Sequence, residues 1–474
     1  MTPASMRLMA NFTQHFVAFI TVLICLMIQS CAVIPDHERA LEKIDPQAQK
    51  LEIVGAKDTL PQAKVDKALQ KLSPDEQIRM ALENHLKIEQ SISDSHLFAD
   101  NTFTPLFNGE TTFNKMKELI GRAEKNIHLE YFTFEDVDLG GVTLKALLLE
   151  KLAKGVEVHV IYDAYGSQQT PREFFESLKN AGAKITEFHP LKGASLSQFS
   201  QRDHRKILIV DGKVAIIGGV NLSKTYQSKG SFKTYKKETP NPLDVVWRDM
   251  DVMVQGPILS DIQRVFLENW DPTQPLDQTH FFPKLSKQGN QFARVIATPV
   301  TKRKDTDSPY YLSVLSAIDN AEHRILINAA YFVPTKGQLQ ALIKAAQRGV
   351  QVKILVPSFT DSTLALLVQR SRYGQLLENH IDIYEMQGQI LHAKTISIDG
   401  VWSTIGSSNF DYRSAGINAE VDVVILGKEI AQALEGRFKE DMADAKKIEL
   451  EEWKKRGLLD RIKQQSARIF EGFL

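Results

Sequence analysis

The sequence predicts an α/β protein built from two fused copies of one domain. At 474 residues, with 43% hydrophobic and 24% charged side chains, the chain has the size and composition of a folded protein with more than one domain. Two strand–helix–strand patterns recur, ending in G-V-E-V-H-V-I-Y-D at 155–163 and G-V-Q-V-K-I-L-V-P at 349–357. Their strands are almost continuously apolar, as in a sheet covered on both faces. Two copies of this length predict a pseudo-twofold dimer within one chain.

Residues 1–31 have the pattern of a targeting segment. Arg7 precedes an apolar run, residues 16–28, which is short for a membrane span and has the length of a signal-peptide core. The run ends in I-Q-S-C, which resembles a bacterial lipobox with Cys31 as the lipidated residue. An uncleaved anchor and a plain secretory signal are the alternatives. In each case we expect the body to lie outside the cytoplasm at a membrane, and Ala32 favours an outer membrane.

The next segment, residues 32–95, is polar and helix-prone, and it predicts a stalk or a small helical lead-in. We place the first repeated domain at 96–285 and the second at 286–474. Both cysteines of the chain lie within the first 31 residues, so neither domain can contain a disulfide or a cysteine-based metal site.

Each repeat leads to the same set of spaced residues. H-R-K-I-L-I-V-D-G at 204–212 and H-A-K-T-I-S-I-D-G at 392–400 share the spacing H-x-K-x4-D, and a glycine and an asparagine follow in both. Three such residues coincide by chance at on the order of one position in ten thousand. The doubled set is therefore a functional signal, and it comprises His204, Lys206, Asp211 and Asn221 with His392, Lys394, Asp399 and Asn409.

This set of side chains suits a phosphodiester. The alternation predicts a strand that carries each histidine and its lysine on one face. Lysine and asparagine donors can hold phosphate oxygens, while one imidazole attacks phosphorus and the other protonates the leaving oxygen. The lysines neutralise the phosphate charge, so we expect no metal and no other cofactor. Asp211 and Asp399 complete the motif, but their place in a D-G turn favours a structural role over a catalytic one.

A nucleophilic histidine needs a carboxylate on its other ring nitrogen. Aligning Gly256 with Gly427 pairs Asp249 with Glu420, which we assign as the orienting carboxylates. The neighbouring pair, Asp251 and Asp422, is also matched and stays an alternative.

These motifs resemble the phospholipase D superfamily, over residues 96 to 474. Further stretches are similar to its bacterial cardiolipin synthases: G-G-V-N at 218–221, W-R-D-M-D-V at 247–252, Y-F-V-P at 331–334, G-S-S-N-F-D-Y-R-S at 406–414 and the tail at 438–456. The resemblance implies two phospholipase D-like domains, each a mixed sheet flanked by helices. It also implies a phosphatidyl-histidine intermediate, with His204 as nucleophile and His392 as acid. The opposite assignment stays open because the copies are nearly equal in sequence.

The implied function is a phosphatidyltransferase that makes cardiolipin from phosphatidylglycerol at a membrane surface. Hydrolysis to phosphatidic acid is the alternative, because the first step is common to both reactions. A nuclease is less favoured, since Lys plus Arg equals Asp plus Glu at 58 each and nucleic-acid binding calls for a basic excess. A non-catalytic lipid-binding protein is disfavoured by two intact His-Lys pairs.

The sequence departs from the cardiolipin synthases in two respects. A lipobox is unusual for cardiolipin synthases, and extra residues near 226–243 separate the first motif from Asp249. This loop, with Lys229, Phe232, Tyr235, Lys236 and Lys237, either shapes the mouth of the pocket or is a plain insertion.

The C-terminal residues 454–473 form an amphipathic basic helix that suits an anionic lipid surface or packs on the catalytic body.

Overall fold

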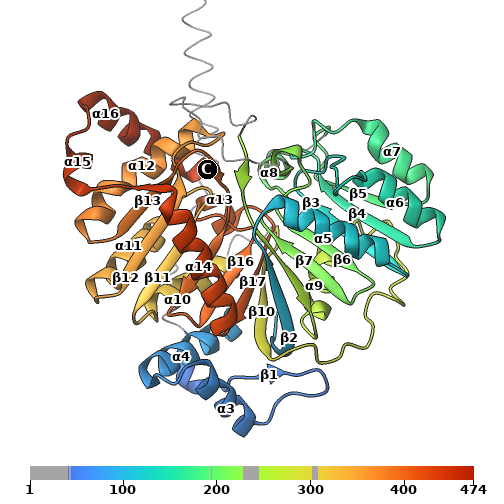
Figure 1. Ribbon diagram of the computed structural model, residues 1–474, viewed down its shortest axis with the longest axis horizontal. Helices are drawn as coiled ribbons and strands as arrows, with labels where there is room; N and C mark the ends of the chain where they lie inside the picture. Colours follow the sequence, from blue (N-terminus) through green and yellow to red (C-terminus); the bar gives the residue numbers. More distant parts are fainter. Residues whose placement is uncertain (1–40, 42–43, 194, 228–244, 301–307) are drawn as a thin grey trace, which may run out of the picture.

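The computed structural model describes residues 41, 44–193, 195–227, 245–300 and 308–474 (Figure 1). The lead-in contains η1 (Pro46–Ala48), β1 (Ile53–Val54), α3 (Gln62–Leu72) and α4 (Glu76–Ile92). The first half then contains β2 (Leu97–Leu106), α5 (Gly109–Arg122), β3 (Asn126–Tyr131), α6 (Leu144–Ala153), β4 (Glu157–Asp163), α7 (Arg172–Asn180), β5 (Lys184–Phe188), α8 (Leu196–Ser200), β6 (Lys206–Val210), β7 (Val214–Gly218), η2 (Lys224–Tyr226), β8 (Trp247–Arg248), β9 (Asp251–Gln255) and α9 (Leu259–Glu268).

The second half repeats this order. It contains β10 (Gln291–Thr298), α10 (Pro309–Asp319), β11 (Arg324–Asn328), α11 (Lys336–Gln347), β12 (Gln351–Pro357), α12 (Thr363–Glu378), β13 (Asp382–Met386), β14 (Ile390–Leu391), β15 (Thr395–Ile398), β16 (Trp402–Gly406), α13 (Tyr412–Gly416), β17 (Glu420–Leu426), α14 (Lys428–Ala443) and β18 (Ala445–Lys447). The chain ends in α15 (Leu450–Lys454), α16 (Leu458–Ala467) and η4 (Arg468–Phe473).

One mixed sheet runs through both halves. The halves meet where β2 pairs antiparallel with β10, with Phe98 opposite Ala293. From that seam the order outward is β9, β7, β6, β3, β4, β5 in the first half and β17, β16, β15, β11, β12, β13 in the second. Each strand and its counterpart in the other half therefore lie the same number of strands away from the seam. A pseudo-twofold relation between two copies requires this arrangement.

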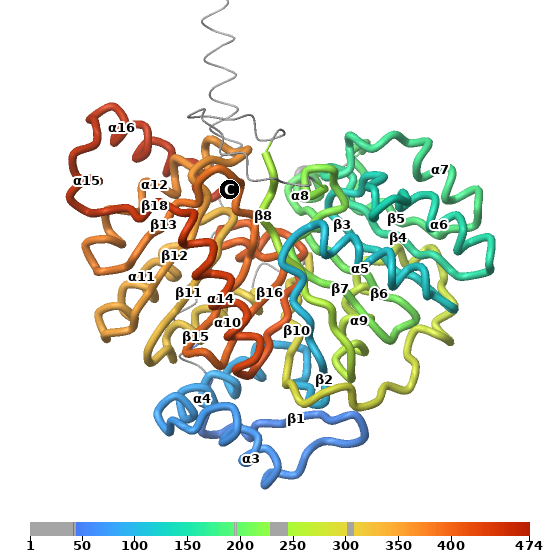
Figure 2. The backbone as a smooth tube through the Cα atoms, in the orientation of Figure 1, coloured from blue at the N-terminus to red at the C-terminus, as the bar shows by residue number. Residues whose placement is uncertain are grey.

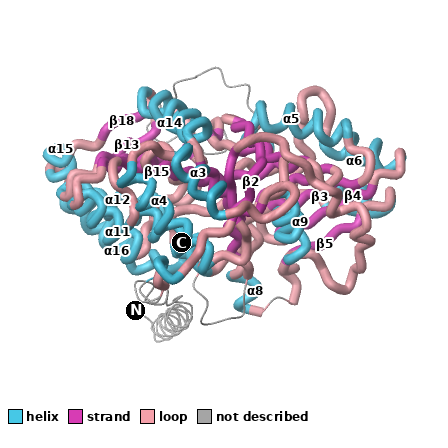
Figure 3. The backbone as a smooth tube through the Cα atoms, turned by 90° about the horizontal axis from the view of Figure 1, so that it is seen from below, coloured by secondary structure: helices cyan, strands magenta, loops and turns pink. Residues whose placement is uncertain are grey.

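Helices cover both faces of this sheet, which explains the continuously apolar strands. Figure 3 shows α5, α6 and α14 on one side of the strands and α9, α11 and α12 on the other. Every residue of β6 and β7 is buried. One apolar core lies mainly in the first half and one mainly in the second. A third core is shared, because Ile217 and Val252 of the first half belong to the same cluster as Val421 and Val423 of the second.

The glycines used to align the two halves occupy equivalent turns. Gly256 follows β9 with a φ of 124°, and Gly427 follows β17 with a φ of 129°. Glycine adopts such angles without the strain that a Cβ would cause. The two positions therefore match in backbone conformation as well as in sequence.

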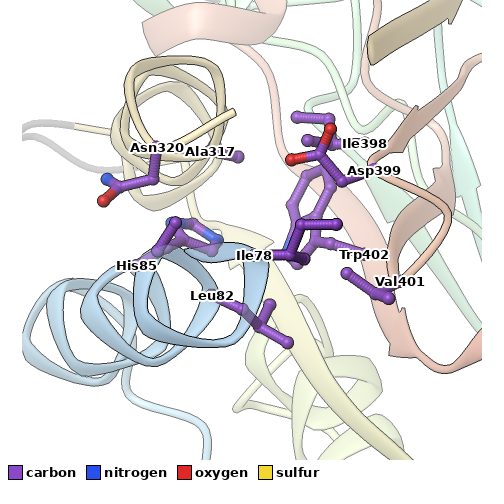
Figure 4. Close-up of a pocket in the computed structure, with 10 residues that line it drawn as sticks. Ile78, Leu82, His85, Ala317, Asn320, Ile398, Asp399, Val401 and Trp402 are labelled. Carbon is purple, nitrogen blue, oxygen red and sulfur yellow. The ribbon is translucent and has the colours of Figure 1, made fainter. Parts of the chain in front are cut away.

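The lead-in helices pack on the second half. Leu82 and Leu86 of α4 lie in the same core cluster as Leu315 and Ile318 of α10. A small pocket of about 20 Å³ remains between α4, α10 and the turn at Asp399 (Figure 4). Figures 1 and 2 place this lead-in at the lower end of the molecule, whereas β8 and α8 lie at the upper end.

Candidate active site

Both motif histidines lie just ahead of a strand, where the chain pairs with the other half. The sequence pattern predicted that His204 and His392 belong to the strands themselves, but β6 begins at Lys206 and β15 at Thr395. The backbone N–H of His204 instead donates to Ala419 O at 2.9 Å, and that of His392 donates to Arg248 O at 2.7 Å. The short pairing of β14 with β8 extends the second contact.

This exchange brings each histidine to a carboxylate of the opposite half. Glu420 follows Ala419, and its carboxylate oxygens lie 3.0 and 3.1 Å from Nδ1 of His204. Asp249 follows Arg248, and its Oδ2 lies 2.6 Å from Nδ1 of His392. A carboxylate only accepts hydrogen bonds, so each Nδ1 carries the proton and each Nε2 keeps a lone pair.

The alternative pair of carboxylates, Asp251 and Asp422, forms its hydrogen bonds with groups other than the motif histidines. Asp251 accepts a hydrogen bond from Val220 N at 3.0 Å, and Asp422 accepts one from the Ser408 hydroxyl. Burial raises the pKa of each to about 8, so both are largely protonated at neutral pH. A Cβ at Gly218 or Gly406 would lie within 2.3 Å of these side chains, which explains why a glycine follows each motif.

The two lysines are buried beside the histidines. Each ammonium donates to the carbonyl of its own motif histidine, Lys206 to His204 and Lys394 to His392. Lys394 also lies 3.8 Å from Asp249. Burial lowers the pKa of Lys206 to about 7 and lowers that of Lys394, while the carboxylates Glu420 and Asp249 oppose the shift in both.

Burial favours the neutral form of both imidazoles. Burial lowers the pKa of His204, although Glu420 opposes the shift. Burial lowers the pKa of His392 to about 4, and the adjoining Lys394 adds to it. For Glu420, burial alone would raise the pKa, but His204, Lys206 and Ser407 outweigh burial and hold it below its usual range.

The two asparagines stand in the loops that follow β7 and β16. Asn221 Oδ1 accepts a hydrogen bond from Thr133 N at 3.2 Å, and its side chain also contacts Tyr226. Asn409 donates its backbone N–H to Ser414 Oγ at 2.9 Å. Its Oδ1 is buried and has no hydrogen-bond partner among the described residues.

Aromatic side chains form the walls around both histidines. The Phe132 ring lies 5.2 Å from the His204 ring, and Lys206 Nζ lies 5.6 Å from the Phe132 centroid. Trp247 and Tyr331 lie 4.7 and 6.0 Å from the His392 ring. Sequence reasoning did not assign these residues to the site, because apolar walls have no motif of their own.

Three hydroxyl groups beside the carboxylates were also missed. Tyr226 Oη lies 3.4 Å from Asp249 Oδ2 and 3.0 Å from His392 Nδ1. Ser414 Oγ donates to Glu420 at 2.8 Å, and the Ser407 hydroxyl donates to the same carboxylate. Tyr226 and Ser414 are separated by the same 188 residues as the two motifs, so the repeat spacing could have revealed them.

Asp211 and Asp399 lie at the far ends of the strands from the histidines. Asp211 accepts hydrogen bonds from the backbone N–H groups of residues 124, 125 and 126, and Asp399 does the same for residues 322, 323 and 324. Each thus ties the turn after β6 or β15 to the start of β3 or β11. This placement fits a structural role in the turn. Neither aspartate contacts a motif histidine.

The arrangement can hold an anionic phosphodiester, with one imidazole to attack phosphorus and the other to move protons. Among the described residues, no cluster of three or more His, Cys, Asp or Glu side chains is placed to hold a metal ion. The same residues include no helix long and apolar enough to cross a bilayer. Cys31, the targeting segment and the loop carrying Lys229, Phe232, Tyr235, Lys236 and Lys237 lie outside the described residues.

Comparisons with known proteins agree with this geometry. The model of the family described as "Cardiolipin synthase, PLD-like domain" matches residues 116–230 and 314–442, just over half of the chain. The probable cardiolipin synthase YwiE of Bacillus subtilis is 34% identical over 373 residues, covering 78% of this chain and 71% of that protein. The major cardiolipin synthase ClsA of the same organism is 29% identical over 403 residues, covering 84% and 80%.

A solved structure supports the fold. The phosphatidylserine synthase of Haemophilus influenzae aligns with a TM-score of 0.62 at 11% identity, covering 84% of this chain and all of that one. At this identity the likeness concerns architecture alone. The family match includes both halves with their His-Lys motifs, and the relatives extend it over most of the sequence, so the chain belongs to the cardiolipin synthase family of phospholipase D-like enzymes.

Proposed function

We propose that this enzyme is a phosphatidyltransferase that joins two phosphatidylglycerol molecules into cardiolipin and releases glycerol. The observation that carries the proposal is the exchange of carboxylates between the halves, because it gives the pocket two oriented imidazoles. Two imidazoles are what a two-step transfer needs, one to hold the phosphatidyl group and one to move protons. The lysines beside them supply charge for the phosphate oxygens.

In the first step, Nε2 of His204 attacks phosphorus and forms a P–N bond. The P–O bond to the headgroup glycerol breaks, and His392 in its protonated form gives a proton to the departing oxygen. The low pKa of His392, about 4, makes its imidazolium a strong proton donor. The negative charge of the bound phosphodiester counteracts Lys394 and favours that imidazolium.

In the second step, the headgroup hydroxyl of another phosphatidylglycerol attacks the phosphatidyl-histidine. His392, now neutral, accepts the hydroxyl proton, and the P–N bond breaks to restore His204. The choice of His204 as nucleophile is supported by its greater accessibility, with 12% of its side chain exposed against 5% for His392. Its Nδ1 also faces one carboxylate only, whereas Nδ1 of His392 has Lys394 and Tyr226 nearby.

The targeting segment supports a further part of the proposal. A lipid on Cys31 would hold the catalytic body at the outer face of a membrane, on the periplasmic side in a Gram-negative cell. Mass analysis of the mature N-terminus tests this placement, since processing would leave a diacylated or triacylated Cys31 as the first residue. An N-terminus that retains residues 1–30 would contradict it.

The decisive experiment supplies the purified enzyme with labelled phosphatidylglycerol vesicles and resolves the lipid products by mass. Cardiolipin with an equal amount of glycerol is the expected result. Phosphatidic acid as the sole product would show that water is the acceptor and would overturn the synthase assignment.

A further inference from the structure

The C-terminal helix turns an apolar face to solvent. Leu458, Leu459 and Ile462 of α16, with Ile469 of η4, are between 52 and 74% exposed, and we call them the C-terminal apolar face. The opposite side of α16 is seated on the body, where Gln464 and Ala467 are buried and the helix contacts α12. The sequence allowed packing or lipid contact for these side chains, and the structure leaves them unpacked.

A second apolar patch lies on the first half. Tyr165 and Phe199 are 45 and 55% exposed, and we call them the α8 patch. The rings of Tyr165 and Phe199 lie edge to face with centroids 6.2 Å apart. Exposed large apolar side chains that gather in this way mark an interaction surface more often than isolated ones do.

Both surfaces border the end of the molecule that holds the histidines. Phe199 precedes His204 by five residues, at the end of α8. Tyr331, which faces the His392 ring, packs in the same small cluster as Ala467 of α16. In Figures 1 and 2, α16 and α8 lie along the same upper edge, on either side of the C-terminus.

Arg413 links the chain segments next to the two surfaces. Its guanidinium donates to Ser200 O at the end of α8, and its backbone N–H donates to Leu474 O at 3.2 Å. Arg413 belongs to α13, the short helix that precedes Glu420. The two surfaces are therefore tied to the catalytic centre by the same segment.

The segment that carries the C-terminal apolar face has an excess of positive charge. Residues 450–474 include six basic and four acidic side chains, in a chain whose formal net charge is zero. Lys455, Arg461 and Lys463 are exposed and lie next to members of this face in the sequence, whereas Lys454 pairs with Glu451 at 3.5 Å. An apolar face flanked by cations fits an anionic lipid surface, where the acyl boundary receives the aliphatic groups and the headgroups receive the ammoniums.

We propose that the C-terminal apolar face and the α8 patch dock the enzyme on an anionic bilayer, with the paired histidines over the lipid between them. The lipid headgroup then reaches the site without leaving the membrane surface. The identity of the lipid as substrate rests on the proposed function, but the docking itself does not.

The test compares two forms of substrate with the full-length enzyme. Rates are measured on phosphatidylglycerol vesicles and on a short-chain phosphatidylglycerol kept below its micelle concentration. For Leu458→Ser/Leu459→Ser/Ile462→Ser, we expect the KM for vesicles to rise at least about tenfold, because aliphatic burial in the interface is lost. The rate on the monomeric lipid should be unchanged. Met80→Ser/Phe282→Ser removes exposed apolar side chains elsewhere and serves as the matched control.

Hydrogen exchange of residues 454–474 locates the contact. Exchange should slow on phosphatidylglycerol vesicles and stay unchanged on phosphatidylcholine vesicles. Equal loss on vesicles and monomeric lipid in the triple variant, or no protection on anionic vesicles, would overturn the docking proposal. Protection that rises with protein concentration alone would assign the face to a second copy and overturn it as well. Protection without any cardiolipin formation would refute the proposed function while leaving the docking surface in place.

Discussion

His204 and His392 occupy equivalent positions in the two halves, and each faces a carboxylate of the other half. The groups behind those carboxylates differ. Glu420 accepts hydrogen bonds from the hydroxyls of Ser407 and Ser414, whereas Asp249 accepts one from Met250 N and lies near the Tyr226 hydroxyl. The position of Ser407 is taken by Gly219 in the first half, because a Cβ there would lie 2.1 Å from Asp249.

This difference shows how one duplicated motif can serve two roles. His204 is held by a carboxylate that is itself fixed by two hydroxyls, which suits a nucleophile that must not move. His392 has the Lys394 ammonium and the Tyr226 hydroxyl 2.8 and 3.0 Å from Nδ1. The ammonium lowers the pKa of the imidazole, so its protonated form releases the Nε2 proton readily. The halves therefore share a fold but diverge in what surrounds the imidazole.

The largest expected effect separates the two histidines by leaving group. His204→Ala should abolish product formation from phosphatidylglycerol and from a para-nitrophenyl phosphatidyl ester, because no P–N bond can form. His392→Ala should lose about 10²–10⁴-fold with phosphatidylglycerol. It should still release nitrophenolate in the first turnover, since that leaving group needs no proton. Stopped-flow absorbance measures the release.

The control for these variants is His323→Ala, which changes a half-exposed histidine away from the site. Nitrophenolate release by His204→Ala but not by His392→Ala would reverse the two roles. Release by both variants would mean that neither imidazole is the nucleophile.

The next largest effect concerns the exchanged carboxylates. Glu420→Gln and Asp249→Asn should each lower kcat about a thousandfold or more, since an amide favours the wrong tautomer of its histidine. The nitrophenyl ester should partly rescue Asp249→Asn and not Glu420→Gln, because the two carboxylates serve different steps. Circular dichroism checks that both variants stay folded. Equal rescue of the two variants would show that Asp249 and Glu420 do not serve different steps.

Much of this architecture could be predicted from the sequence, because a repeated motif and apolar strands depend on local pattern. The exchange of carboxylates could not, since it depends on which segment of one half faces which segment of the other. Pattern alternation also placed His204 within the strand, whereas tertiary pairing with Ala419 draws it out ahead of β6. The exposure of Leu458 and Leu459 was likewise undecidable, because an amphipathic pattern does not say what covers its apolar side.

A smaller effect compares the equivalent hydroxyls. Ser414→Ala should lower kcat about tenfold, because a buried oxygen of Glu420 loses a close hydrogen bond. Tyr226→Phe should cost less, about threefold, since its hydroxyl lies 3.4 Å from Asp249 and Met250 N still serves that carboxylate. Steady-state kinetics on both variants gives the ratio. A larger loss for Tyr226→Phe would place the more demanding orientation at His392.

The pH dependence should report on Lys206. Its pKa of about 7 means that kcat/KM should fall as pH rises through that value, because the free enzyme loses a cation that holds the phosphate. A bound phosphodiester favours the charged ammonium, so the corresponding fall in kcat should lie at higher pH. Initial rates between pH 5 and 9 measure both. Because deprotonation of His392 also lowers the rate as pH rises, Lys206→Arg is the comparison. A fall of the same size at the same pH in this variant would assign it to the imidazoles and not to Lys206.

The smallest catalytic effect is expected at the turn carboxylates, Asp211 and Asp399. Each residue has a φ of 53° and accepts backbone hydrogen bonds, and neither contacts a histidine. Alanine at either position should lower the free energy of unfolding by about 1–3 kcal/mol and leave kcat nearly unchanged. Asp399→Ala should cost more, because its three hydrogen bonds are all 2.8 Å long and its side chain is more deeply buried.

Asparagine at the same positions is the matched control for these two variants. It tolerates the left-handed backbone and keeps one acceptor oxygen, so it should recover part of the lost stability. Urea unfolding followed by circular dichroism, with kcat measured on the same samples, separates stability from chemistry. A loss of kcat of a hundredfold in a folded Asp211→Ala or Asp399→Ala would contradict the structural role. The motif aspartate would then have to affect the reaction indirectly, through the turn and the strand that separate it from the histidine.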